Sequence, residues 1–133
     1  MTVWRNYKQN PGNESKYHSE KVTLDGETFD SRREARRWMD LRLLEQAGEI
    51  LDLRRQVKYI LIPTQREEGD GKKPGKLLEK ECSYRADYVY TDARTGETIV
   101  EDVKGYKEGG AYAVFVIKRK LMLYVHGIRV QEV

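Results

Sequence analysis

Two stretches with the composition of β-strands, CSYRADYVYT at residues 82–91 and TIVEDVKG at residues 98–105, are separated only by the short turn sequence DARTGE. Both are rich in β-branched and aromatic residues, which pack well on a pleated surface. Strands joined by so short a connection pair antiparallel, because a parallel pair needs a crossover of a dozen or more residues. These residues are therefore predicted to form a hairpin within one sheet.

The flanking segments predict two helices and further strands around this hairpin. Residues 29–50 carry Ala, Trp and Leu at helical spacing and close with Gly48, a usual residue at a helix C-terminus. Residues 111–127 also have helical length and end at Gly127, with apolar positions on more than one face. The other strand signals are the short hairpin KVTLDGETF, the run LRRQVKYILIP and the C-terminal IRVQEV.

The predicted order is helix, three strands, helix and strand, preceded by an N-terminal β-hairpin, which makes this an α/β chain. The last strand–helix–strand step is long enough for a right-handed parallel crossover, so a mixed sheet flanked by helices is expected. With 133 residues the chain has the size of one domain. We expect a loosely ordered tail at residues 1–16 and a single domain at residues 17–133, with a long loop or flexible hairpin tip at residues 64–80.

Composition argues against several classes of site. A single cysteine, Cys82, excludes an internal disulfide, and His18 and His126 lie too far apart in sequence to suggest a zinc motif. No stretch has the run of about 18 apolar residues that a membrane helix needs, and the N-terminus lacks a secretory signal pattern. We expect no membrane association, and the cytoplasm is the default compartment.

Basic residues form two clusters, although the formal net charge is only +3. The first, SRREARRW, lies at the start of a predicted helix, where the helix dipole disfavours each cation by about 0.3 to 1 kcal/mol. A solvated helix face explains such a cluster, but a bound phosphate backbone would offset that cost. The candidate contacts to an anion are Arg32, Arg33, Arg36 and Arg37, with Lys118 and Lys120 from the second cluster, IKRK.

Acidic residues gather at the end of the predicted hairpin. If its turn lies midway between Arg94 and Thr95, Asp102 lies directly opposite Asp87. Like charges opposed in this way lie about 5 Å apart and destabilise a sheet. A divalent cation such as Mg²⁺ between them is the economical explanation, and Lys104 shares the face of Asp102. The alternatives are a register shifted by one residue, or an exposed Asp102–Lys104 pair beside a solvated Asp87.

Glu34 is a further acidic candidate. It lies four and seven positions before Trp38 and Leu41, so it projects from the apolar side of the helix toward the presumed sheet. It also fits a capping box with Ser31, in which its carboxylate reaches back to the N-cap backbone. One carboxylate cannot fully serve both roles, and the sequence leaves both open.

These residues resemble the PD-(D/E)XK nuclease superfamily, which has the restriction-endonuclease-like fold. The resemblance rests on the order of elements, with Glu34 in the first helix, Asp87 in the second core strand and Asp102-Val103-Lys104 in the third. The stretches FDSRREARRW, YRADYVY, VEDVKGY and KRKLMLYVHGIRVQEV are more closely similar to small phage and prophage proteins described as nuclease-like or resolvase-like. The resemblance covers roughly residues 17–133.

The resemblance implies a catalytic site. It makes Asp87 and Asp102 metal ligands, Lys104 the catalytic lysine, and Glu34 a catalytic and metal-binding acid from the helix. The implied cofactor is Mg²⁺, for which Mn²⁺ would substitute.

The chain also departs from the superfamily pattern. Ala86 stands where the motif has proline, and Asp102 stands where glutamate is commoner. The shorter carboxylate leaves a metal shell that Glu101 or a water would complete. Gln56 matches a polar position that lines the site in some relatives, although an ordinary surface position on a strand explains it equally well.

The activity implied by the resemblance is metal-dependent endonucleolytic hydrolysis of DNA. The implied partner is double-stranded or branched DNA, and the phage resemblance favours structure-selective cleavage, as by a Holliday junction resolvase, in phage recombination or packaging within the bacterial host. Cutting both strands of a junction needs two sites, so a homodimer is expected. The alternatives are a DNA-binding module without catalysis and a phage structural or regulatory protein.

Overall fold

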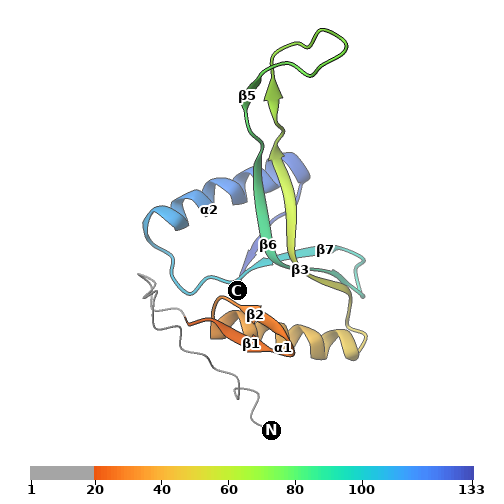
Figure 1. Ribbon diagram of the computed structural model, residues 1–133. Coiled ribbons are helices and arrows are strands. Elements are labelled where there is room, and N and C mark those ends of the chain that lie inside the picture. Colours follow the sequence, from red (N-terminus) through yellow and green to blue (C-terminus); the bar gives the residue numbers. More distant parts are fainter. Residues whose placement is uncertain (1–19) are drawn as a thin grey trace.

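The structure, a computed structural model, describes residues 20–133, so the predicted tail at residues 1–16 lies outside the described residues. The elements follow one another in the expected order, with an additional small hairpin between two long strands (Figure 1). They are β1 (Val22–Leu24), β2 (Glu27–Phe29), α1 (Arg32–Gln46), β3 (Ile50–Ile62), β4 (Gln65–Arg66), β5 (Leu77–Glu79), β6 (Cys82–Asp92), β7 (Thr98–Asp102), α2 (Gly109–Leu121), the π-helical turn η1 (Met122–His126) and β8 (Gln131–Glu132).

A four-stranded sheet with the order β3-β6-β7-β8 forms the centre. β3, β6 and β7 are antiparallel neighbours, whereas β8 runs parallel to β7. The chain passes from β7 to β8 through α2, which is the crossover that the length of this step predicts. The protein is therefore an α/β protein with a mixed sheet and two helices.

The β6–β7 hairpin has the register deduced from its turn. Tyr88 pairs with Glu101, and continuing the same pairing by one residue brings Asp87 opposite Asp102. The alternative of a shifted register is therefore wrong. β7 ends at Asp102, so Lys104 lies just beyond the strand, where its backbone N–H donates to the carbonyl of Val133 at 3.0 Å.

Two cores pack against the sheet, and in β7 they take alternate residues, since Ile99 packs against the first core and Val100 belongs to the second. The β1–β2 hairpin and α1 pack on one face, where Trp38 stacks on Tyr88 with 5.9 Å between ring centroids. α2 covers the other face, where Phe115 lies 6.2 Å from the ring of Tyr84 and Met122 is fully buried. The N-terminal part of α1 and the segment after β7 are thereby brought to the same part of the sheet.

Residues 64–80 form an arm with its own strands instead of an unstructured loop. β4 pairs with β5 and extends the β3–β6 hairpin, which projects from the rest of the molecule in Figure 1. Near its tip the carboxylate of Asp70 accepts hydrogen bonds from the backbone N–H groups of Lys72 and Lys73 at 3.0 and 2.9 Å. The segment is therefore a hairpin arm.

The start of α1 and the end of η1 both carry residues that commonly cap helices. Ser31 caps α1, since its Oγ accepts a hydrogen bond from the backbone N–H of Glu34 at 3.1 Å. The turn η1 ends at Gly127, whose φ of 67° is left-handed and therefore favours glycine. Within residues 20–133, no helix has the length and apolar character required to cross a bilayer.

Candidate active site

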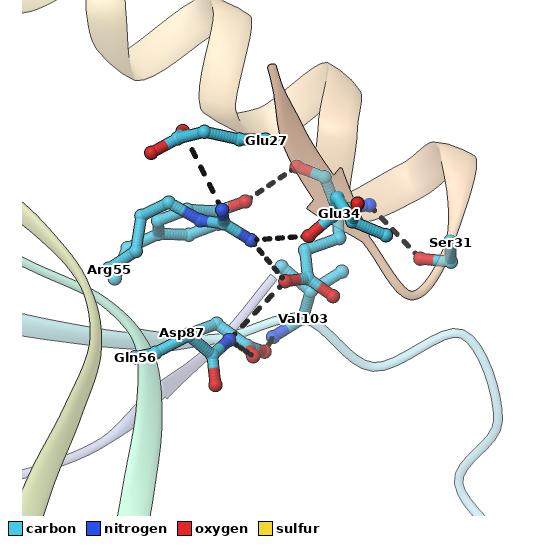
Figure 2. A network of polar contacts seen from close by, with 9 residues as sticks. Glu27, Ser31, Glu34, Arg55, Gln56, Asp87 and Val103 are labelled. Carbon is cyan, nitrogen blue, oxygen red and sulfur yellow. Dashed lines mark hydrogen bonds and ion pairs between the residues drawn. The ribbon is translucent and has the colours of Figure 1, made fainter. Parts of the chain in front are cut away.

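Glu34 and Asp87 lie where the first turn of α1 approaches β3, β6 and the segment after β7 (Figure 2). Gln56 lies at the centre of this network. Its Nε2 donates to Glu34 Oε1 at 3.4 Å and to Asp87 Oδ1 at 3.2 Å. The second oxygen of Asp87 accepts from the backbone N–H of Val103 at 2.8 Å. Tyr88 fixes α1 to the sheet, because its hydroxyl donates to the carbonyl of Glu34 at 2.7 Å.

Gln56 adopts a left-handed backbone conformation with a φ of 51°. Such a conformation costs a residue with a side chain about 1 to 3 kcal/mol and is commonest at functional sites. Strand pairing continues on both sides of it, Arg55 with Tyr88 and Val57 with Ala86. The left-handed backbone at Gln56 therefore leaves the register unchanged, and the side-chain amide contacts Glu34 and Asp87. Of the two predicted alternatives, a site-lining residue and an ordinary surface position on a strand, the structure supports the first.

The surroundings of Asp87 disfavour the ionised form of its carboxyl group. Burial, with the nearby charge of Asp102, raises the pKa of Asp87 to about 6. The hydrogen bonds from Val103 and Gln56 and the charge of Lys104 lower that pKa but do not cancel the rise. The two aspartates thus repel each other across β6 and β7, as the register predicted.

Asp102 is only 5% exposed, and both its oxygens have protein partners. Tyr84 donates its hydroxyl to Oδ2 at 2.6 Å, and Lys104 Nζ lies 2.7 Å from Oδ1. The ammonium of Lys104 also lies 3.9 Å from the ring centroid of Phe115, so it is held over an aromatic face. The alternative of an exposed Asp102–Lys104 pair is wrong, because Asp102 is buried.

Glu34 is likewise 5% exposed. Different atoms of Glu34 contribute to the cap of α1 and to the acidic cluster, which consists of Glu34, Asp87 and Asp102. Its backbone N–H makes the cap with Ser31, while its Oε1 lies 3.6 Å from Arg55 Nη2. Burial is the main cause that raises the pKa of Glu34 to about 7, and the charges of Asp87 and Asp30 add to it. A carboxyl group with this pKa exchanges protons near neutral pH.

Arg55 belongs to this network although sequence reasoning did not single it out. Figure 2 shows its guanidinium between Glu27 and Glu34. Its Nη2 donates to the carbonyl of Thr28 at 3.1 Å, and the guanidinium carbon lies 3.9 Å from the ring centroid of Phe29. Within the described chain, its Nε is the one buried side-chain polar atom without a hydrogen-bond partner. An arginine within a predicted strand was its only sequence signal, and that signal is too common to mark a site.

Glu101 and Arg37 form an ion pair on the α1 face of the sheet, away from Asp102. Arg37 donates through Nε and Nη2 to the two oxygens of Glu101 at 2.7 and 2.6 Å, and Tyr90 donates its hydroxyl to the same carboxylate. Glu101 is 1% exposed. Two expectations are thereby corrected. Glu101 cannot complete a metal shell with Asp102, and Arg37 is committed to a structural pair instead of a DNA contact.

The other basic candidates lie at the helix surfaces. Arg119, which lies between the candidates Lys118 and Lys120 in the sequence, pairs with Glu132 of β8 at 3.3 Å. Arg32 lies 3.5 Å from Glu20 in a pair between exposed side chains. The exposed candidates are Arg32, Arg33 and Arg36 on α1 and Lys120 on α2, and Lys118 is half-buried.

The register of β6 and β7 brings Asp87 opposite Asp102, where the two carboxylates could share a cation. Nowhere in residues 20–133 do three His, Cys, Asp or Glu side chains gather closely enough to form a metal-binding group. A cation would therefore replace the donors Gln56 and Lys104 at two carboxylate oxygens and complete its shell with water. Such a site suits Mg²⁺, which prefers oxygen ligands and retains several waters.

The comparison with known proteins places the chain in a family. No curated protein and no solved structure matches the sequence significantly. Residues 14–129, most of the chain, match the family described as "Protein of unknown function (DUF1064)". The protein with this acidic cluster therefore belongs to the DUF1064 family.

Proposed function

We propose that this protein is a Mg²⁺-dependent endonuclease that hydrolyses phosphodiester bonds in DNA, on a restriction-endonuclease-like core. The observation that carries the proposal is the juxtaposition of Asp87 and Asp102 on adjacent strands, with Lys104 paired to Asp102. Two neighbouring carboxylates and a lysine are a donor set suited to metal-assisted phosphodiester hydrolysis. The order of the helices and strands supports a core of this type.

The two aspartates would hold the cation. Their repulsion contributes to the raised pKa of Asp87, and a divalent cation bound between them would relieve it. Carboxylate oxygens suit Mg²⁺, and Mn²⁺ is expected to substitute for it. When bound, the cation supplies a lowered pKa for its water and positive charge at the scissile phosphate.

The side chains around the aspartates have distinct tasks. Lys104, once displaced from Asp102, supplies a positive charge where negative charge develops on the phosphate. Tyr84 keeps Asp102 oriented after that displacement, because it holds the other oxygen. Glu34, whose pKa is about 7, accepts a proton from water. The resulting hydroxide bonds to phosphorus, the bond from phosphorus to the 3′ oxygen breaks, and that oxygen takes a proton from solvent, so the products carry a 5′-phosphate and a 3′-hydroxyl.

DNA would be held by the basic side chains of the two helices. Arg32, Arg33 and Arg36 lie in the first turns of α1, the same part of the helix that supplies Glu34, and Lys118 and Lys120 lie on α2. Contacts of this kind bind phosphates and position the duplex without reading its sequence. They fit structure-selective cleavage of double-stranded or branched DNA, as by a Holliday junction resolvase. In this proposal the enzyme is a homodimer that acts in phage recombination or packaging in the host cytoplasm.

A role without catalysis is the second candidate, as a DNA-binding module or as a phage structural or regulatory protein. One observation favours it. Every oxygen of Asp87 and Asp102 is already engaged by a donor of the protein: Gln56, Val103, Tyr84 or Lys104. A site that no longer binds a cation would be stabilised in this way.

Cleavage of a supercoiled plasmid and of a synthetic four-way junction tests the function, in Mg²⁺, in Mn²⁺ and in EDTA. The nuclease proposal predicts cleavage that requires the cation and that Lys104→Ala abolishes. Lys58→Ala is the matched control, since Lys58 pairs with Glu81 at 3.2 Å outside the acidic cluster. DNA binding by folded protein without cleavage of either substrate would favour the module, and neither binding nor cleavage would favour the structural or regulatory role.

A further inference from the structure

The helix α2 is apolar on its outer face as well as on the face that packs against the sheet. Phe115 and Met122 are buried on the inner face. On the outer face, Ile117 is 60% exposed and Tyr124 is 88% exposed. A helix that is apolar on both faces is normally covered on both. The outer stripe consists of Gly110, Val114, Ile117, Leu121 and Tyr124. Leu121 lies at its edge, since it is half-buried and also packs against the inner core, and Tyr124 lies in η1.

The spacing of this stripe indicates what kind of surface covers it. Its positions in α2 recur at intervals of four, three and four residues, and Tyr124 follows three residues later in the π-helical turn η1. This is the spacing of the a and d positions with which one helix faces another in a coiled coil. The complementary surface is therefore a helix with a similar stripe.

The stripe is complementary to itself in the antiparallel direction. Its N-terminal end has the small residue Gly110, and its C-terminal end has the large residue Tyr124. A two-fold axis at Ile117 would bring Gly110 of one copy opposite Tyr124 of the other, and Val114 close to Leu121. The antiparallel arrangement also aligns opposite ends of the two helix dipoles.

The geometry points to the outer face of α2 as the homodimer interface of this protein, with α2 of one copy packed antiparallel on α2 of the other. The stripe and the neighbouring Val125 leave roughly 500 Å² of apolar surface exposed, which is at the upper end of what a monomer shows. A stable dimer buries about 800 Å² on each partner, so the stripe would form the apolar centre of the interface. Lys118 and Lys120 flank the stripe and would lie at its rim, within reach of DNA phosphates.

This interface deepens the proposed function, because it assigns a surface to the dimer that cleavage of both strands requires. It is tested without DNA. Sedimentation equilibrium of the full chain at micromolar concentrations should give twice the monomer mass of 15.6 kDa. Ile117→Glu should weaken dimerisation at least about 30-fold, because it places two charges at the two-fold axis.

Leu43→Glu is the matched control, since Leu43 is 64% exposed on α1 and lies outside the stripe. It should leave the dimer intact, and circular dichroism should show that both variants remain folded. A monomeric wild type, or an Ile117→Glu protein that dimerises as tightly as the Leu43→Glu protein, would overturn the interface. Neither result would bear on whether the site cleaves DNA.

A cross-linking experiment covers the case in which Ile117→Glu does not fold. In a Cys82→Ser background, Ile117→Cys should form a disulfide-linked dimer when oxidised with diamide, because the axis brings the two thiols together. Leu43→Cys in the same background should stay largely unlinked. Equal linking of the two variants would contradict the antiparallel arrangement.

Discussion

The side-chain amide of Gln56 donates a hydrogen bond to Asp87 Oδ1 at 3.2 Å from a residue whose backbone φ is 51°. Lys104 engages an oxygen of Asp102 in a comparable way, at 2.7 Å. In the absence of a cation, these two donors offset the charges of the aspartates. The stability of the fold and the affinity of the site for a cation are therefore coupled through Gln56 and Lys104.

Gln56→Ala is expected to lower the free energy of unfolding by about 1 to 3 kcal/mol at pH 8. The variant loses the donor shared by Glu34 and Asp87, while the unfavourable φ at this position remains. Urea denaturation measures the change. Gln65→Ala, at an exposed position of β4, should change the stability by less than about 0.5 kcal/mol. Equal effects of the two substitutions would show that the amide does not stabilise the acidic cluster.

Asp87→Asn is expected to stabilise the protein at alkaline pH. Since the folded-state pKa of Asp87 is raised from 3.8 to about 6, the stability linked to its protonation is complete below the lower value and is lost as the pH rises through the higher one. The amide does not ionise, so without divalent cations the variant should be more stable than the wild type by up to about 3 kcal/mol at pH 8.

The difference between Asp87→Asn and the wild type should shrink toward zero near pH 4, and denaturation over a pH series measures it. The control is Asp40→Asn, at an exposed position of α1, whose difference from the wild type should stay nearly constant with pH. A variant less stable than the wild type at pH 8 would mean that the hydrogen bonds of Asp87 outweigh its repulsion from Asp102.

Arg37→Ala is expected to destabilise the fold by about 3 to 5 kcal/mol, because it leaves the buried carboxylate of Glu101 without its guanidinium partner. Adding Glu101→Gln to Arg37→Ala should recover part of the loss. Thermal and chemical unfolding measure both variants, and Arg33→Ala on the exposed side of α1 is the control. A loss no greater than that of Arg33→Ala would contradict the structural role of Arg37.

The cleavage rate is expected to rise with pH below about 7, because the ionised fraction of Glu34 increases there and a cation beside Asp87 would lower the pKa of Glu34 from its cation-free value. Glu34→Gln should lower the rate at least about 100-fold and should remove this rise. Initial rates of plasmid nicking over a pH series, at saturating cation, measure both effects. If the variant kept the wild-type pH profile, another group would be the proton acceptor.

Much of the fold could be predicted because local patterns determine it. The turn DARTGE limited the β6–β7 pairing to a few registers, and the one centred on it pairs Tyr88 with Glu101 as observed. That register placed Asp87 opposite Asp102. The spacing of Glu34 from Trp38 and Leu41 placed its side chain on the buried side of α1.

The remaining features depend on contacts between distant residues. The left-handed φ of Gln56 has no local sequence signal, since glutamine does not favour it. The pairing of Arg37 with Glu101 joins residues 64 positions apart, and only the assembled sheet shows that Glu101 faces α1. Arg55 was missed for the same reason, because its partners Glu27 and Glu34 come from β2 and α1.

The most direct test of the central claim, that Asp87 and Asp102 share one cation site, is calorimetric titration of the folded protein with Mn²⁺ at pH 7.5. The wild type is expected to bind one cation per chain. Binding should be lost in Asp87→Asn and in Asp102→Asn and kept in Asp40→Asn. A heat of binding that is the same in Asp87→Asn as in the wild type would contradict the claim.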